Sequence, residues 1–392
     1  MTTCIAVEGD RVETPRSLGV GTTPVVAGAL AFLALTLAVF WHQLHRIQAG
    51  DVSPRWAELR WGYLVLLILC LPLETLAAAC RTRVVARVLH PGLGFWTCLR
   101  AEWVNVAMNL LTPAHLGGGP GQIYIMGRAG VRAGTALTIS LLGFLGTMIG
   151  LMAMGLYALL ATSAHPGGPL FAGSVGCLAA VAGGMLAAGL WPHGFRAGLG
   201  WLSRGLWRLA GRRVRLEPWW PPGDPRTGPP VDQLPHAAAM LADIVYTYQA
   251  DVRRFLRVGK ARFVAVCLLS LAFLFSRCLL PYLCLRFLGI EGSSFADTLE
   301  RQTGLVFLVF FAPTPGGAGV AEAVSLAAMG DVVPAGFAPY YNLLWRFATA
   351  YLPALAGLVC LAVALAQDAH RALRRRGPGL SETAWPERRT DP

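Results

Sequence analysis

Charged residues are scarce in this chain of 392 residues, since Asp, Glu, Lys and Arg make up 14% of it while 55% is apolar. Typical soluble domains carry about 25% charged residues, so this composition predicts an integral membrane protein. Lysine is almost missing: Lys260 is the only one, and arginine supplies nearly all of the net charge of +12. The arginines are dispersed between apolar stretches and form no single basic stripe, so we do not expect binding to nucleic acid.

Several signatures of catalysis and of metal binding are also missing. The sequence contains no Ser-His-Asp set, no HExxH, no Walker loop and no cluster of carboxylates, so we predict no catalytic residues, no metal ligands and no cofactor. The nine cysteines lie mostly in apolar stretches and none is spaced as CxxC, which favours buried hydrophobic roles. No apolar core lies in residues 1–23, so we expect the first apolar run to remain as a span and not to be a cleaved signal peptide.

Long apolar runs, in contrast, are abundant. A bilayer core about 30 Å thick takes about 20 residues of α-helix. About six stretches meet that length, namely 24–44, 61–79, 134–161, 170–191, 263–288 and 340–366. Two further apolar stretches, 94–126 and 297–330, are interrupted by Gly and Pro and are not expected to cross straight. The sequence therefore predicts an all-α polytopic membrane bundle with about six full spans and two re-entrant broken-helix hairpins.

Arginine bias near the span ends predicts the orientation. Segments 192–262 and 368–392 are rich in arginine, and arginines flank 94–126 on both sides, so these regions are expected in the cytoplasm with residues 1–23. Counting spans then leaves both ends of 297–330 outside. Membrane halves 24–191 and 263–367 would thus be joined by a cytoplasmic linker. Within it, residues 240–256 have apolar residues at helical spacing beside arginines, which predicts an amphipathic helix on the inner membrane surface. We expect the tail to be disordered.

The two interrupted stretches resemble each other. Each has a charged start, an apolar half-helix, a break with proline and a GGxG sequence, GGPG at 118–121 and GGAG at 316–319. Glu102 precedes Gly118 by 16 residues, and Glu300 precedes Gly316 by the same 16. We interpret them as an inverted pseudo-repeat whose turns line a polar space, because exposed backbone is unstable in hydrocarbon. The helix after each turn would favour an anionic head group. Helix kinks or surface loops are the alternative.

Charged residues within apolar surroundings mark further candidates. A charge at the bilayer centre costs about 2.5–3.5 kcal/mol on insertion scales, so Arg277, Glu322 and Arg346 need partners or water. We predict that Glu322 pairs with Arg277 or Arg346 and leaves the other arginine for a phosphate. A structural ion pair is the alternative. His115 and Gln122 are weaker candidates for binding the head group. We expect Glu74 and Arg81 to form a snorkelling pair.

Three sequence motifs resemble one known family. Residues 111–131 resemble the TPxxxGGxPxQxY motif of the lysylphosphatidylglycerol synthase transmembrane-region family, also called flippase-like domain proteins. Residues 312–322 resemble its TPGGxGxxE motif, and 345–357 resemble its RxxTxxxPxxxG pattern. The first motif often carries a polar or acidic residue where Gly119 stands, so the resemblance carries no head-group specificity there. It transfers a site role to Pro113, Gly117, Gly118, Gln122, Thr314, Gly316, Gly317, Gly319, Glu322 and Arg346.

The resemblance implies a lipid-handling membrane domain, which in multiple peptide resistance factor proteins flips an aminoacylated phospholipid and precedes an aminoacyltransferase domain. This chain ends about 25 residues after its last predicted span, so we expect no transferase. We expect a flippase in the cell membrane for an anionic lipid, such as a phospholipid or a polyprenyl-phosphate-linked substrate. The alternatives are a component of a lipid-modifying transferase, a partner of a separately encoded synthetase or glycosyltransferase, and a scaffold. The sequence leaves open whether the protein forms a homo-oligomer.

Overall fold

The computed structural model describes residues 57–112, 115–161, 168–191, 236–310, 312 and 314–376, together with residues 34, 38, 41 and 45. All regular structure in this part of the chain is helical, so the predicted all-α class is confirmed. Most of the predicted span 24–44, the N-terminal segment, Pro113, the linker up to 235 and the tail after 376 lie outside the described residues.

The helices follow the predicted stretches closely. They are α2 (Trp61–Leu89), α3 (Phe95–Leu111), α4 (Gly118–Arg128), α5 (Ala133–Ala161), α6 (Gly168–Leu190), α8 (His236–Val258), α9 (Lys260–Phe287), α10 (Phe295–Phe310), the 3-10 turn η3 (Pro315–Gly317), α11 (Val320–Met329), α12 (Ala338–Arg346), the π-helical turn η4 (Phe347–Tyr351) and α13 (Leu352–Arg376). Each interrupted stretch is thus a helix, a break and a second helix, as predicted.

Within the described residues, four helical segments are long and apolar enough to cross a membrane, namely Trp61–Leu89, Ala133–Tyr157, Lys260–Phe287 and Ala338–Arg371. In α6 the described apolar part, Gly176–Leu190, is shorter. The chain is therefore a multi-pass membrane protein by length and composition, and the total of about six spans stays a prediction.

Helix α2 continues ten residues beyond its predicted end at 79. The apolar run stops at Arg81, but the helix does not, because Arg81 is buried against protein partners and faces neither lipid nor water. A charge ends a hydropathy signal even where a tertiary contact satisfies it, so hydropathy underestimated the length of this helix.

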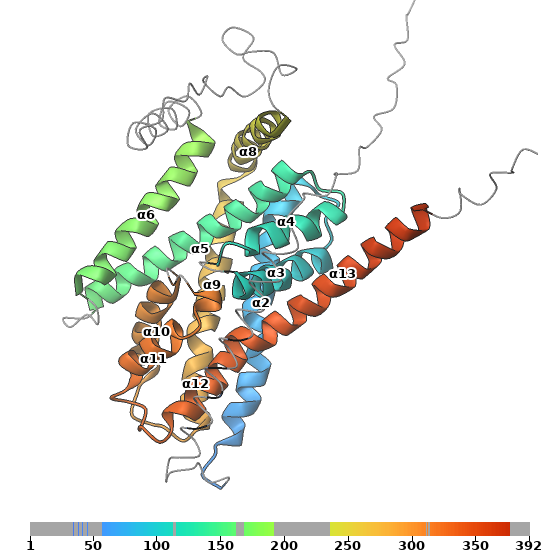
Figure 1. Ribbon diagram of the computed structural model, residues 1–392. Helices are drawn as coiled ribbons and strands as arrows, with labels where there is room; N and C mark the ends of the chain where they lie inside the picture. The colour runs from blue at the N-terminus through green and yellow to red at the C-terminus, as the bar shows by residue number, and fades with distance from the viewer. Residues whose placement is uncertain are drawn as a thin grey trace, which may run out of the picture.

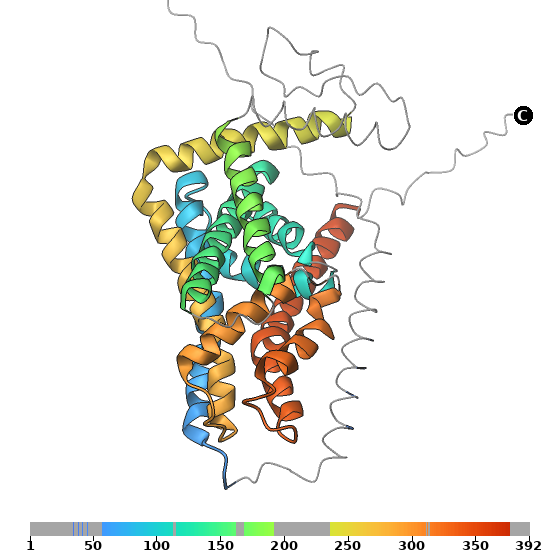
Figure 2. The ribbon, with the colours of Figure 1, turned by 90° about the vertical axis from the view of Figure 1, so that its left-hand side faces the viewer.

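The bundle is centred on α2 and α9, which pack along each other, with α3 packed against both α2 and α13. Figure 1 shows α5 and α6 on one side of this centre and α13 crossing the other side. Figure 2 shows α8 lying across one end of the bundle. We call this end the α8 end. Loops 288–294 and 330–337 lie at the opposite end.

Helix α8 confirms the predicted amphipathic helix, but its apolar face is covered by protein. Tyr248, Val252 and Phe255 are buried in the core shared with α5 and α6. The Tyr248 hydroxyl donates to the carbonyl of Met185 at 2.9 Å, and an added Cβ at Gly189 would lie 2.8 Å from Val252. The sequence did not reveal this docking onto α6, and the position of the helix at the inner membrane surface stays a prediction.

A π-helical turn joins α12 and α13. The N–H of Leu352 donates to the carbonyl of Phe347, five residues earlier. Pro353 follows at once and lacks an N–H, so the carbonyl of Thr349 cannot receive its usual bond from four residues on. The wider turn accommodates this loss, and π turns of this kind are frequent at functional sites. It begins directly after Arg346.

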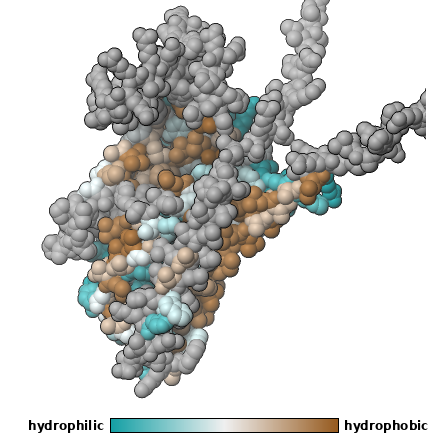
Figure 3. All heavy atoms as spheres, viewed as in Figure 1, coloured by the Kyte–Doolittle hydropathy of each residue, from teal (hydrophilic) through white to brown (hydrophobic). Residues whose placement is uncertain are grey.

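Much of the exposed surface of the long helices is apolar, as contact with lipid requires. Figure 3 shows a continuous hydrophobic strip along α13. Large apolar side chains on three of the long helices are exposed, including Val65, Leu69, Val264, Leu268, Leu355, Val359 and Val363. Patches of this extent are rare on soluble monomers and mark membrane or partner contacts.

Candidate functional site

The break between α3 and α4 is held by side chains from the end of α3. The N–H of Gly118 donates to Asn109 Oδ1 at 2.9 Å, and that of Gly117 donates to Thr112 Oγ1 at 2.7 Å. These oxygens satisfy N–H groups that the start of a helix leaves unpaired. The N-terminus of α4 is therefore capped by the protein itself. Nearby, His115 adopts φ of 57°, an uncommon conformation for a residue other than glycine.

The break between α10 and α11 has a different geometry. Gly316, Gly317 and Gly319 all have positive φ, which only glycine adopts at low cost. Helix α11 begins at Val320, and the carboxylate of Glu322 accepts from the N–H of Gly319 at 2.7 Å. A carboxylate in this position also interacts favourably with the positive end of the helix dipole. Glu322 thus stands where a phosphate was expected.

The two GGxG sequences are therefore not equivalent in structure. In the first, GGPG forms the start of α4, whereas in the second, GGAG is a left-handed turn before α11. In the described part of the first break, the residue with positive φ is His115, three positions before Gly118. Sequence spacing aligned the two segments correctly as helix, break and helix, but it did not determine where the second helix of each begins.

The two breaks meet inside the bundle. A Cβ added at Gly316 would lie 2.5 Å from Leu110 Cδ2, so the second turn packs directly against the end of α3. Gly316 is buried, and its carbonyl accepts from Arg346 Nη2 at 3.1 Å. Segments about 200 residues apart in the sequence thus form one structural unit around Arg346.

Arg346 and Glu322 form a buried ion pair. Arg346 Nε lies 2.8 Å from Glu322 Oε1, and both side chains are almost inaccessible to solvent. The guanidinium also lies over the rings of Trp345 and Tyr351, with ring centroids 5.8 and 5.7 Å away. Of the two arginines predicted as partners of Glu322, Arg346 is the one that pairs with it in the structure.

Arg277 has another partner, which the sequence analysis missed. Its Nη1 donates to Glu74 Oε1 at 2.6 Å, linking α9 to α2. Glu74 and Arg81 therefore do not form a snorkelling pair, because each binds a residue of a different helix. The charges of Arg277 and Arg346 both act on His115, so these three cationic or basic groups lie near one another around the breaks. Within the described residues, His115 Nδ1 and Thr314 Oγ1 are buried without a hydrogen-bond partner.

A model of the lysylphosphatidylglycerol synthase TM region family matches residues 25–357, most of the chain. The chain belongs to this family. A comparison with curated proteins finds no match. The matched range includes both breaks, Glu322 and Arg346, so the site just described lies wholly within the family domain.

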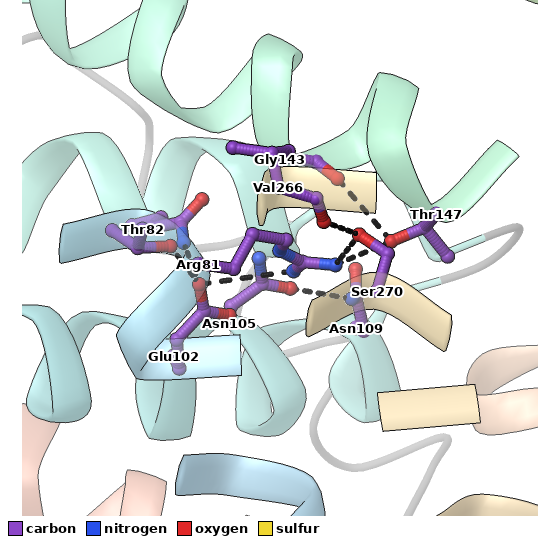
Figure 4. Close-up of polar contacts among 10 residues, drawn as sticks. Arg81, Thr82, Glu102, Asn105, Asn109, Gly143, Thr147, Val266 and Ser270 are labelled. Carbon is purple, nitrogen blue, oxygen red and sulfur yellow. Dashed lines mark hydrogen bonds and ion pairs between the residues drawn. The ribbon is translucent and has the colours of Figure 1, made fainter. Parts of the chain in front are cut away.

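This family member also contains a second polar centre, which the sequence analysis did not identify. Figure 4 shows Arg81 between Glu102 and Thr82 on one side and Thr147 and Ser270 on the other. Arg81 Nη1 donates to Thr147 Oγ1 at 2.5 Å, and Nη2 lies 3.9 Å from Glu102 Oε1. The centre therefore links α2, α3, α5 and α9.

Gln122 belongs to this second centre. Its Nε2 donates to Glu102 Oε1 at 2.9 Å, so it connects α4 to α3 instead of lying beside Glu322. The predicted site residues thus fall into two groups. Gly316, Glu322 and Arg346 gather at the junction of the breaks, with His115 and Arg277 close by. Gln122 belongs with Glu102 and Arg81.

The described residues contain no group of three or more His, Cys, Asp and Glu side chains arranged to hold a metal ion. The polar chemistry of the site consists of guanidinium, carboxylate, imidazole and backbone groups. Such groups bind anions and move protons.

Removing the Asn109 side chain should loosen the first break. We expect Asn109→Ala to lower stability by about 1 kcal/mol, because the N–H of Gly118 would lose its cap. Thermal unfolding in detergent, followed by tryptophan fluorescence, measures the effect. An unchanged midpoint would show that this cap is dispensable. Asn105→Ala, which removes the acceptor of the other Asn109 hydrogen bond and leaves the cap in place, serves as the control.

Proposed function

We propose that this protein is a flippase that moves an anionic amphipathic lipid between the leaflets of the cell membrane. The name of its family links the domain to lysylphosphatidylglycerol, a phospholipid derivative. The proposed lipid class includes phospholipids and polyprenyl-phosphate-linked substrates. Their head groups would bind at the junction of the breaks while their chains stay in the bilayer.

The observation that carries the proposal is the meeting of two broken helix pairs beside buried charges. Leu110 of the first pair contacts Gly316 of the second, and Arg346 binds the carbonyl of Gly316. Non-helical backbone at membrane depth is stable only when it is buried in protein or lines a wet cavity. Helix pairs of this kind at an internal repeat interface are typical of alternating-access transporters.

We further propose that the two pairs are re-entrant hairpins that enter from opposite faces. The first pair follows α2 and precedes α5 at the α8 end, whereas the second lies between loops at the opposite end. Arginines concentrate at the α8 end, including Arg83, Arg87, Arg128, Arg132, Arg254 and Arg257. The positive-inside rule supports a cytoplasmic α8 end, with both termini on that side.

At the opposite end, charges are balanced by pairing. Arg301 binds Asp331 through two hydrogen bonds of 2.6 and 2.8 Å, and this contact lowers the pKa of the Asp331 carboxyl. Arg60 pairs with Glu291. Balanced charge supports an external location for this end. A separately encoded synthetase or glycosyltransferase that supplies the lipid, and a second copy of the chain, are partners that this function would accommodate.

Reconstitution tests the proposal. The protein is placed in phosphatidylcholine vesicles with fluorescent phosphatidylglycerol or a fluorescent polyprenyl phosphate, and dithionite bleaching reports the fraction exposed outside. We expect exchange of at least one of these anionic probes to be faster than in empty vesicles. Equal rates for both probes with and without protein would contradict the proposal.

His115 offers a matched pair of variants for the same assay. Hydrogen bonds to charged groups contribute about 1.5–3 kcal/mol, so His115→Ala should slow exchange about tenfold or more if the imidazole binds the head group. His90→Ala, at the end of α2 and away from the breaks, should leave the rate unchanged. Equal rates for the two variants would exclude His115 from the site.

A further inference from the structure

Within the described residues, three Arg–Glu pairs have a buried carboxylate, namely Arg81–Glu102, Arg346–Glu322 and Arg277–Glu74. The first two carboxylates have additional donors. Glu102 accepts from Thr82 and from Gln122, and Glu322 accepts from a backbone N–H. Each of these two would keep a hydrogen bond if its arginine moved away.

Glu74 is held differently. In the described part of the chain, its carboxylate has a hydrogen bond from Arg277 and from no other group. Its side chain is 6% exposed, so water does not replace the arginine. Glu74 therefore depends on a single counter-ion.

That counter-ion is the accessible one of the three. The side chain of Arg277 is 35% exposed, against 9% for Arg81 and 7% for Arg346. Arg277 lies near the middle of α9 and close enough to His115 for its charge to act on the ring. Of the three guanidinium groups, that of Arg277 is therefore the one that a lipid phosphate can reach, whereas Glu74 is buried.

We infer that Glu74 is a proton-binding site coupled to lipid binding at Arg277. When a lipid phosphate takes over the guanidinium, Glu74 would be left as an uncompensated buried charge, which is strongly unfavourable. Glu74 then takes up one proton and becomes a neutral carboxylic acid. When the lipid leaves, Arg277 returns and the proton is released. This inference rests on the proposed lipid translocation.

Neighbouring groups are consistent with this exchange. On α9, the titratable groups beside Glu74 are Arg277 and the thiol of Cys278. The break after α3 contributes His115 near Arg277, and Arg81 lies seven residues further along α2, bound to Glu102. Among the described residues, Arg277 is the one that forms an ion pair with Glu74, so its position controls whether the buried carboxylate has a counter-ion.

The coupling has a consequence for energetics. A lipid with one negative charge would move together with one proton, so the loaded carrier transfers no net charge. The empty carrier, with Glu74 and Arg277 paired, is neutral at this site as well. The pH gradient should then drive transport, and the membrane potential should have no effect on it. At one proton per lipid, a gradient of one pH unit supports an accumulation of about tenfold.

Vesicles with a pH gradient test the inference. The protein is reconstituted with fluorescent phosphatidylglycerol or a fluorescent polyprenyl-phosphate-linked sugar, both of which are phosphodiesters with one negative charge, and a pH-sensitive dye is trapped inside. We expect the probe to accumulate about tenfold in the leaflet facing the more alkaline side per pH unit, with a matching proton influx when the acidic side is outside. A potassium diffusion potential without a pH gradient should cause no accumulation.

Variants localise the effect. Glu74→Gln keeps the shape and an acceptor for Arg277 but cannot take up the proton, so the probe should still equilibrate while the pH-driven accumulation disappears. Glu291→Gln, which alters the exposed partner of Arg60, should keep the accumulation. If Glu74→Gln fails to fold, the proton influx of the unmodified protein decides.

Three outcomes would overturn the inference. Two of them refute the proton site alone and leave the flippase intact, namely lipid exchange that does not respond to the pH gradient and accumulation that persists in Glu74→Gln. The third, absence of exchange of both probes at every pH, refutes the proposed function and the proton site together.

Discussion

Arg346→Leu is expected to destabilise the protein by about 3–5 kcal/mol and to abolish lipid exchange. The substitution would leave Glu322 as a buried charge that keeps the hydrogen bond from the N–H of Gly319 but loses its counter-ion. It would also remove the donor to the carbonyl of Gly316, at the point where the two breaks meet. Thermal unfolding in detergent and the dithionite assay measure the two effects.

A double variant separates stability from transport. Replacing a buried ion pair completely by neutral groups is often tolerated, so Arg346→Leu with Glu322→Gln should recover most of the lost stability. Exchange should stay abolished if transport needs the bond from Arg346 to the carbonyl of Gly316 at the junction of the breaks. A double variant that transports like the unmodified protein would assign the pair a purely structural role.

Arg301→Leu is the control for this experiment. Its bond to Asp331 lies at the surface, and exposed ion pairs contribute about 0–1 kcal/mol. We therefore expect a small change in stability and normal exchange. A loss as large as that of Arg346→Leu would show that burial is not what distinguishes the two arginines.

Much of the helical framework was predictable from the sequence because hydrophobic runs and Gly/Pro breaks are local signals. Both interrupted stretches were located to within a few residues. The membrane class was likewise visible in composition alone. What those signals lacked was the partner of each buried charge.

Charge pairing is a tertiary property and could not be predicted in the same way. Glu74 and Arg277 are 203 residues apart, and nothing in their local sequence indicates that α2 and α9 pack together. Arg81 ended a hydropathy run although its charge is satisfied inside the bundle. Glycine spacing also failed to distinguish GGPG within α4 from the left-handed GGAG turn, because glycine is compatible with both conformations.

Gly357→Ala is also expected to destabilise the protein, for a different reason from the loss of Arg346. A Cβ at Gly357 would lie 2.0 Å from the carbonyl oxygen of Trp103 and 2.6 Å from its carbonyl carbon. These are backbone atoms of α3, so no rotamer change relieves the contact. Overpacking costs about 1–3 kcal/mol and sometimes more when backbone must shift.

The displacement should also reach the site. Helix α3 leads directly into the break at His115 and contacts Gly316 through Leu110, so pushing α3 away from α13 separates the two breaks. We expect lower thermal stability together with a loss of lipid exchange. Gly127→Ala in α4 is the control, since nothing lies within 4 Å of the added methyl, and it should be neutral or stabilising by about 1 kcal/mol. If Gly357→Ala has the same unfolding temperature and the same exchange rate as the unmodified protein, α3 and α13 do not pack at this distance. The junction of the breaks would then not depend on their contact.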